Sequence, residues 1–267
     1  MRPGRRRHRA RLWTRALVGA AVVMTVVVVG ALALTGGGSD RSILSTVTST
    51  TSVSTSASAQ RLPVAVPVTI LPGPVAPVIS KIPTTNPVVF FTIDDGLVRD
   101  PAAVDFIRVH HIPVTLFVLP VPLQQDPAYF LTLAQVGASV QDHTVHHLPL
   151  RKLSAARQVQ EVCGSIDLLH RTFGRRPWLF RPPYGDYNTS TKYAVRQCGL
   201  QAIVTWQGTM NDGVLRLQHP GPLQRGDIIL MHFRPDLRRN LEVLLKAAKT
   251  AGLVAAPLEQ YLTEPTP

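Results

Sequence analysis

The chain has little charge, and the charge that it has is unevenly placed. Only 16% of its 267 residues are charged, and no acidic residue stands among the seven arginines of the first fifteen residues. Without those arginines the net charge of +12 falls to about +5. Basic and aromatic residues are not interleaved after this run, which argues against a nucleic-acid-binding surface. The chain also has no internal repeat.

Charge is missing altogether from residues 16–34, ALVGAAVVMTVVVVGALAL. A helix of this length extends about 28 Å, close to the ~30 Å hydrocarbon core of a bilayer. We therefore predict a single transmembrane segment over residues 16–36, with the basic tail 1–15 in the cytoplasm. The alternative is a signal peptide cleaved near Ala31-Leu32-Ala33. Both interpretations export the remainder, as a single-pass cell-membrane protein with its folded domain outside, or as a secreted protein if the segment is cleaved.

Cysteine is scarce, with Cys163 and Cys198 as the two examples. An exported protein can join such a pair in one disulfide. Sequence alone does not show that their Cα atoms come close enough, and the alternative is two small apolar residues on core-facing helices.

Residues 37–87 are rich first in serine and threonine and then in proline and valine. Their first part has too little apolar bulk for a core, and their prolines are too frequent for a helix or an inner strand. We predict a disordered linker here that holds the domain away from the membrane, with room for part of it to lie against the domain surface.

Residues 88–262 alternate short β-branched or aromatic runs with longer helical stretches, which predicts βα units around a parallel sheet. About seven strands in this length favour an α/β fold, an incomplete (β/α)7 TIM-like barrel, over an open doubly wound sheet. The expected strands are 88–93, 113–119, 137–141, 178–181, 201–206, 227–231 and 253–256, and the expected helices are 101–110, 127–136, 153–173, 189–198 and 237–251.

Four of the expected strands end in ionisable residues, and in either architecture the carboxyl ends of the strands form the functional rim. Neighbouring residues on a strand point in opposite directions, so two adjacent acids can serve two purposes. Two histidines four positions apart would share one face of a helical turn, at metal-ligand distance. The groups concerned are Asp94-Asp95, His143 with His147, Arg181-Pro182-Pro183-Tyr184, and His232.

Together these motifs resemble the polysaccharide deacetylase family, the NodB-homology domain of carbohydrate esterase family 4. That family has, in order, a T-F-D-D-G strand end, H-[ST]-x-x-H, R-x-P-Y, a D-W element and L-x-H. The resemblance covers roughly residues 88–258, and its counterparts here are residues 92–96, 143–147, 181–184, 212–213 and 230–232.

The resemblance implies that Asp95, His143 and His147 bind a divalent metal, usually Zn²⁺. Two imidazoles and one carboxylate leave positions open for water and substrate, as in a catalytic site. Asp94 would then be the general base, with Arg181 holding its orientation.

The remaining roles that the resemblance implies concern the substrate. The backbone N–H of Tyr184 would share the oxyanion with the metal, and Pro183 and Leu230 would line the pocket, Leu230 at the acetyl methyl group. His232 would be the general acid that protonates the leaving amine, and Asp212 would favour its charged form.

The sequence departs from the family pattern at Thr209, where the family often has Asp, and at Gly213, where it has Trp. We expect the loss of the Trp to alter the pocket and the rate rather than the reaction.

The expected function is metal-dependent removal of N-acetyl groups from N-acetylglucosamine or N-acetylmuramic acid units of peptidoglycan or a chitin-like glycan. The expected partners are that polysaccharide and the membrane. Two alternatives remain at this point: an inactive or weakly active cell-wall glycan-binding protein on the same fold, and an O-deacetylase of acetylated xylan.

Overall fold

The computed structural model describes residues 64–263. The predicted basic tail, the transmembrane segment 16–36 and the Ser/Thr-rich part of the linker lie outside this range. Between residues 64 and 263, no helix has the length and apolar character needed to cross a bilayer.

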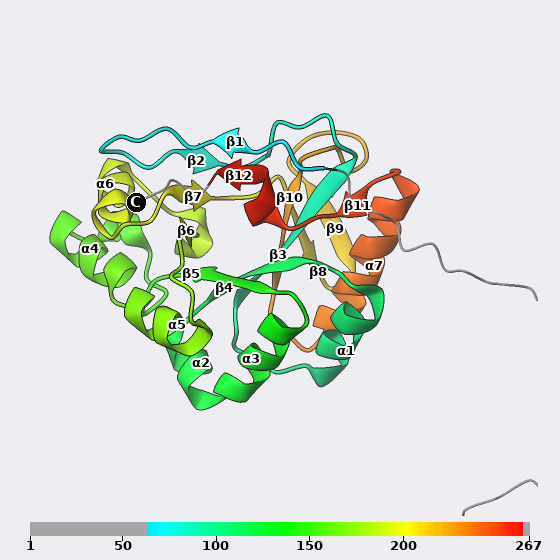
Figure 1. The fold of residues 1–267 in the computed structure, drawn as a ribbon, viewed down its shortest axis with the longest axis horizontal. Coiled ribbons are helices and arrows are strands. Elements are labelled where there is room, and N and C mark those ends of the chain that lie inside the picture. The colour runs from blue at the N-terminus through cyan, green and yellow to red at the C-terminus, as the bar shows by residue number, and fades with distance from the viewer. Residues whose placement is uncertain (1–63, 264–267) are drawn as a thin grey trace, which may run out of the picture. The chain divides into compact units, whose positions relative to one another are not determined.

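The central feature is one curled sheet whose strands are parallel except for the last (Figure 1). Its order is β2-β7-β6-β5-β4-β3-β10-β8-β9, and β11 pairs with β3. The two edge strands of this order are β2 and β9, which do not pair with each other, so in the described part of the chain the barrel stays open between them. The strands are β2 (Val78–Ile79), β3 (Val88–Asp95), β4 (Val114–Val118), β5 (Ser139–Asp142), β6 (Leu179–Phe180), β7 (Ala202–Val204), β8 (Gly208–Asn211), β9 (Val214–Leu217), β10 (Ile228–His232) and β11 (Val254–Ala255).

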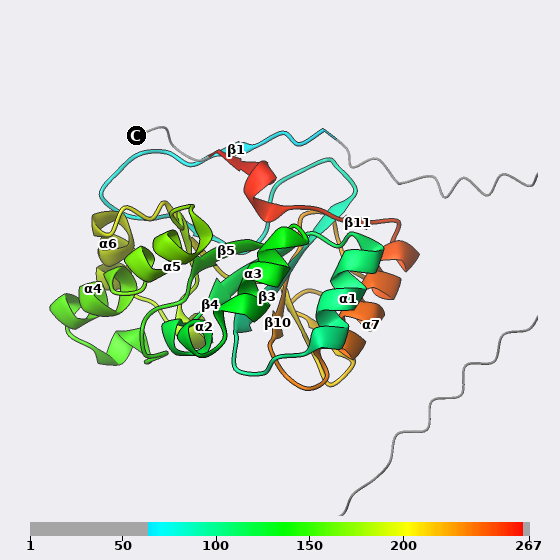
Figure 2. The same cartoon turned by 60° about the horizontal axis from the view of Figure 1, so that its bottom comes forward.

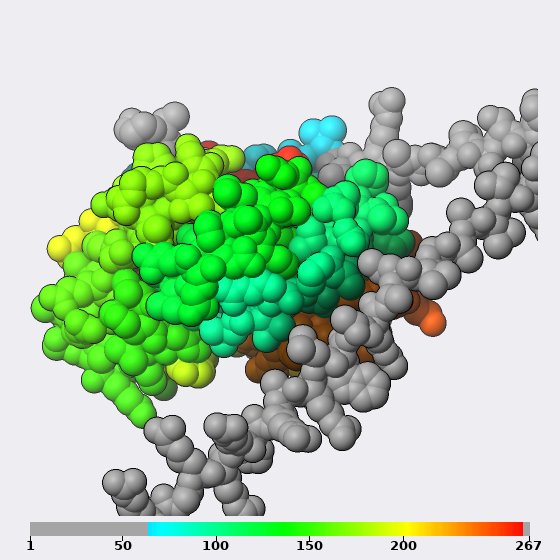
Figure 3. Space-filling model, turned by 90° about the horizontal axis from the view of Figure 1, so that it is seen from below, coloured from blue at the N-terminus to red at the C-terminus, as the bar shows by residue number. Residues whose placement is uncertain are grey.

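Helices follow the strands and cover the outer face of the sheet (Figures 1 and 2). Figure 3 shows part of this helical surface, with α1 in teal beside α2 and α3 in green. The helices are α1 (Pro101–His110), α2 (Pro120–Gln125), α3 (Pro127–Gln135), α4 (Ala155–Cys163), α5 (Ile166–Phe173), α6 (Thr189–Gln197) and α7 (Leu237–Thr250), with 3-10 turns η1 (Leu150–Lys152), η2 (Pro183–Gly185) and η3 (Leu258–Tyr261).

Strand β3 illustrates how the sequence pattern positions the site. Its residues Val89, Phe91 and Ile93 belong to the apolar cluster shared with the helices. Because side chains alternate along a strand, Thr92 and Asp94 point to the opposite face, into the barrel. Both are buried, so the polar residues of this strand lie inside a mostly apolar scaffold.

The predicted helix 153–173 is instead two helices, because the chain turns at Gly164. A Cβ at that position would lie 2.7 Å from Val145 Cγ2, in the loop that also carries His143 and His147. The disulfide between Cys163 and Cys198 is present, with their Cα atoms 5.1 Å apart, and it joins the end of α4 to the end of α6.

Residues 64–87 do not behave as a free linker. Their strand β1 (Val68–Thr69) pairs with β12 (Leu262–Thr263), and β2 pairs with β7. Ile70, Ala76 and Ile82 are buried in the two smaller apolar clusters. The predicted boundary at residue 88 therefore lies inside the folded unit, because apolar residues between the prolines reach the core.

Candidate metal centre and active site

Asp94 and Asp95 end β3 and face the same pocket, not opposite directions as alternation predicts. Asp95 has φ = 80°, which redirects its side chain, and Gly96 follows at φ = 94°. A Cβ on Gly96 would lie 2.8 Å from Phe130 Cζ, so this turn needs glycine. Asp94 Oδ2 and Asp95 Oδ1 consequently lie 3.8 and 3.4 Å from one atom, His143 Nε2.

His143 and His147 come together through a loop, and the predicted helical turn is wrong. The chain after β5 is irregular, with left-handed φ angles of 70° at Thr144 and 56° at His147. The N–H of His147 donates to Thr144 Oγ1 at 3.1 Å, which stabilises the turn. The two imidazole rings have their centroids 5.1 Å apart. Such unusual backbone angles cluster at functional sites, where surrounding contacts maintain them.

Asp95, His143 and His147 form a donor set that fits a cation. One ligand atom from each lies within 4.8 Å of the other two. Asp95 Oδ1 is 3.3 Å from His147 Nε2, and this buried oxygen has no hydrogen-bond partner. A carboxylate and two imidazole nitrogens are typical ligands of catalytic zinc, and a cation would satisfy the buried oxygen.

The outer nitrogens of both histidines are already engaged. His143 Nδ1 lies 2.7 Å from the carbonyl oxygen of Arg181, which can only accept, so this nitrogen carries the proton and Nε2 keeps its lone pair. His147 Nδ1 lies 3.2 Å from Tyr184 Oη. Second partners of this kind orient metal-binding imidazoles and fix their tautomer.

The charges around these residues favour a positive group between them. Burial raises the pKa of Asp95, but its interactions with His143 and His147 outweigh that effect and hold the pKa well below its ordinary value. Burial lowers the pKa of His143, and the carboxylates of Asp94 and Asp95 more than reverse this, so the pKa is raised. The pocket thus attracts a proton or a metal cation to the same place.

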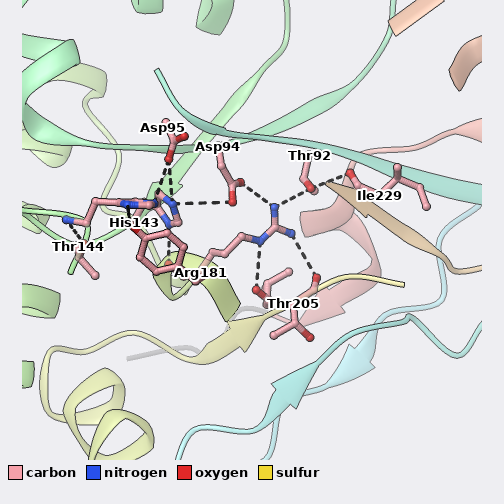
Figure 4. A network of polar contacts seen from close by, with 11 residues as sticks. Thr92, Asp94, Asp95, His143, Thr144, Arg181, Thr205 and Ile229 are labelled. Carbon is pink, nitrogen blue, oxygen red and sulfur yellow. Dashed lines mark hydrogen bonds and ion pairs between the residues drawn. The ribbon is translucent and has the colours of Figure 1, made fainter. Parts of the chain in front are cut away.

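Arg181 is the largest fully buried side chain, and it holds Asp94 (Figure 4). Its Nη1 donates to Asp94 Oδ1 at 2.8 Å and to Thr92 Oγ1 at 2.7 Å. Its Nε and Nη2 donate to the carbonyl oxygens of Val204 and Thr205. Asp94 therefore has one oxygen fixed by a charge-assisted hydrogen bond and the other directed towards the metal ligands.

His232 ends β10 directly beside Asp94, because the two are paired in the sheet register. Leu230 pairs with Thr92 in the same register, is 3% exposed, and points to the same face as His232. His232 Nδ1 is buried without a hydrogen-bond partner. Burial lowers the pKa of His232, while Asp94 and Asp95 oppose that change.

The predicted pairing of Asp212 with His232 is wrong. Asp212 is exposed, in the tight turn between β8 and β9, with φ = 53°, and its N–H donates to Asp236 Oδ2. Gly213 follows at φ = 73°, where a Cβ would lie 2.8 Å from Arg239 Nε. Two successive left-handed residues are characteristic of a hairpin turn, so this Asp-Gly pair shapes a hairpin and does not reach the pocket.

Tyr184 and Pro183 lie at the edge of the pocket, in η2. Tyr184 has φ = 61° and is 68% exposed, and its ring lies 4.7 Å from that of His147, centroid to centroid. Pro183 is buried. The sequence interpretation missed Trp206, whose ring centroid lies 5.7 Å from Arg181 Cζ. No signal based on ionisable residues would have found it.

Comparisons with known proteins identify the family of this chain. The polysaccharide deacetylase family model matches residues 81–203. An uncharacterized protein of Streptomyces coelicolor is 42% identical over 198 residues, which cover 70% of this chain and 77% of that protein. The chain belongs to the polysaccharide deacetylase family. The prediction of this family from the sequence motifs is confirmed.

Other members of the polysaccharide deacetylase family differ in activity. A peptidoglycan-N-acetylglucosamine deacetylase of Bacillus cereus is 26% identical over 160 residues, which cover 55% of this chain and 56% of that enzyme. The chain thus matches just over half of that relative's length. BA3943 of Bacillus anthracis, a pseudoenzyme of carbohydrate esterase family 4, has the same fold, with a TM-score of 0.62 at 16% identity over 70% of this chain and 69% of that one. The expected α/β fold is confirmed, with a curled half-barrel sheet, and the fold alone does not distinguish an enzyme from a pseudoenzyme.

Proposed function

We propose that the protein is a metal-dependent hydrolase that removes N-acetyl groups from a glycan of the peptidoglycan or chitin type. One observation carries the proposal: the cation-binding trio of Asp95, His143 and His147 lies beside an Arg181-held Asp94 and a His232 that is paired with Asp94 in the sheet. Deacetylation of an amide needs a nucleophilic water, a base and an acid, and this arrangement provides a group for each.

The metal site would supply a Lewis acid. A divalent cation, most simply Zn²⁺, held by the trio would polarise the acetyl carbonyl and lower the pKa of the attacking water. Asp94 Oδ2 is the base that takes the proton, since Arg181 occupies Oδ1. The N–H of Tyr184 stabilises the developing oxyanion, and Leu230 contacts the acetyl methyl group.

His232 completes the reaction by protonating the leaving nitrogen. An amine departs from carbon only with a proton, so acetate and a free amino sugar form once His232 has donated one. The metal ligands and Asp94 act before this step, and His232 acts on the opposite side of the bond that breaks.

The proposal is tested by acetate release from peptidoglycan, chitooligosaccharide and acetylated xylan, each with and without a chelator. We expect release from the first two, and chelation should abolish it. Release from xylan alone would instead favour an O-deacetylase.

The Asp95→Ala variant should lose both bound zinc and acetate release, because one of three ligands is gone. Zinc content and activity are measured on the same folded sample. Full activity in this variant would refute the assigned ligand set.

The His232→Ala variant should bind zinc normally and turn over about 10²–10⁴-fold more slowly, as expected for the loss of a general acid. Loss of zinc in this variant would show that His232 binds the metal and that its assignment as the general acid is wrong.

One observation favours a second candidate, a glycan-binding protein with little turnover. His232 Nδ1 has no hydrogen-bond partner, so no carboxylate binds this nitrogen directly, and burial lowers the pKa of the imidazole that must donate the proton. Glycan binding without acetate release from any of the three substrates would support it.

The export of the domain and its membrane tether also remain part of the proposal, and recovery of the full chain from the soluble cell fraction would contradict them.

A further inference from the structure

A hollow of about 580 Å³ opens beside the metal trio. Pro149, Arg151, Lys152, Tyr184 and Asp186 line it, so it lies between η1 and η2. Tyr184 forms the link to the trio, because its hydroxyl lies 3.2 Å from His147 Nδ1 while most of its ring is exposed. A sugar chain with one unit at the metal would therefore place a neighbouring group in this hollow.

The charges of the hollow do not cancel. Asp186 accepts from the backbone N–H of Arg151 at 3.0 Å and forms an ion pair with the side chain of the same residue. The negative charge of Asp186 is thus neutralised by Arg151. Lys152 is exposed and, within residues 64–263, has no ion pair or side-chain hydrogen bond. The hollow is therefore lined by one positive charge that no acidic side chain matches.

Lys152 is held in position by its backbone. It is the last residue of η1, its N–H donates to Pro149 O at 3.1 Å, and the preceding Leu150 is fully buried in the core. The base of the side chain is therefore fixed, while the ammonium group is free to meet a ligand. An ammonium group in this state favours an anionic partner such as a carboxylate.

We propose that Lys152 is a specificity-determining residue that binds a carboxylate carried by the glycan, so that acidic N-acetylated glycans are preferred over neutral ones. The carboxylate is assigned to the sugar itself, as in N-acetylmuramic acid. A carboxylate on an attached peptide is the other source of the same chemistry. This inference rests on the proposed function, since it names the substrate class of the same site.

The test compares four glycans of equal length: a wall glycan stripped of peptide with free sugar carboxylates, the same glycan with those carboxylates converted to primary amides, the peptide-bearing glycan, and chitotetraose. KM and kcat come from acetate release, and Kd comes from calorimetry on chelator-treated protein, which does not turn over. The variants are Lys152→Ala, Lys152→Glu and Lys152→Arg, with Lys249→Ala as a control at an exposed lysine of α7.

We expect the wild-type protein to bind the free-carboxylate glycan about 5–10-fold more tightly than its amide, and added salt should reduce the difference. Lys152→Ala should remove this preference and leave kcat within twofold, Lys152→Glu should reverse it, and Lys152→Arg should retain it. Lys249→Ala should change nothing.

Equal affinity of the wild-type protein for acid and amide would overturn the inference, as would an equal loss for both in Lys152→Ala. A preference limited to the peptide-bearing glycan would overturn the assignment to the sugar. Absence of acetate release from all four glycans would count against the proposed function alone, because the Kd comparison decides the inference without turnover.

Discussion

Asp142 directly precedes the metal ligand His143 and is completely buried. Burial raises the pKa of its carboxyl group to about 7, although the hydrogen bond from Ser165 Oγ opposes this change. In the unfolded chain this group ionises near pH 4. Folding therefore takes up a proton between about pH 4 and pH 7, and the contribution of Asp142 to the free energy of unfolding is lost as the pH rises through this range.

An Asp142→Asn variant, which has no proton to take up, should lack this loss. In chelator-treated protein, urea unfolding at pH 5 and pH 8 should show the variant gaining on the order of 2 kcal/mol relative to wild type at the higher pH. Asp167→Asn, at an exposed acid, is the control and should show no such trend. A difference between Asp142→Asn and wild type that is the same at both pH values would contradict the assignment.

At the residue scale, most site residues could be predicted from the sequence because strand ends converge at one rim. Asp94, Asp95 and His232 come together through the parallel register of β3 and β10. The direction of Asp95 could not be predicted, because alternation gives way to a left-handed residue at the strand end. The predicted pairing of Asp212 with His232 is wrong for a different reason. It rests on the match to the family's D-W element, whereas the Asp-Gly pair at these positions itself predicts a hairpin turn.

At the scale of elements, the sequence analysis does not predict the β8–β9 hairpin or helix α2, because in both places one sequence pattern outweighs another. The sequence analysis predicts no strand at β8 or β9, although the Asp-Gly pair between them is typical of a hairpin turn. Helix α2 begins with Pro120 and Pro122, which suggest a loop but are acceptable in the first turn of a helix, where backbone N–H groups have no partner. Strands and helices with a clear apolar period were predicted to within a few residues.

Gly226 joins the segment before β3 to the sheet, and its replacement tests that contact. Its carbonyl accepts from the N–H of Ile82, its φ is 80°, and a Cβ would lie 1.9 Å from Ile82 O. Gly252 also has a left-handed φ, 69°, but nothing lies within 4 Å of its Cβ position. Both Gly→Ala changes introduce backbone strain of about 1–2 kcal/mol, and Gly226→Ala must displace a backbone as well.

We therefore expect Gly252→Ala to lower the free energy of unfolding by about 1 kcal/mol and Gly226→Ala to lower it by at least twice as much. Urea titration of both variants measures the difference. Equal losses would show that the segment does not pack as described.

At the scale of the whole molecule, the least predictable feature is where the domain begins. Proline and valine in residues 61–87 match a linker in composition, and composition does not reveal that β1 and β2 find partners more than 120 residues away in the chain. The partners of these strands, β12 and β7, are not neighbours in sequence. Only the folded arrangement in Figure 1, where β1 lies beside β12, makes the segment part of the domain.

Truncated chains test whether residues 64–87 are part of the folded domain or a linker. A chain that begins at residue 64 keeps the buried Ile70 and Ile82, and a chain that begins at residue 88 loses both. Full burial of one such side chain contributes about 1.5–3 kcal/mol, and domains of this size are stable by only about 5–15 kcal/mol.

The shorter chain should therefore melt roughly 10 °C or more below the longer one, as followed by circular dichroism, since about 1 kcal/mol corresponds to 2–4 °C in a domain of this length. An Ile82→Ala change in the longer chain should reproduce part of the loss, because it removes one of the two contacts and keeps the strand pairing. If both chains melted at the same temperature, residues 64–87 would be a linker after all, and the core would have to be stable with the surface beneath Ile82 exposed to water.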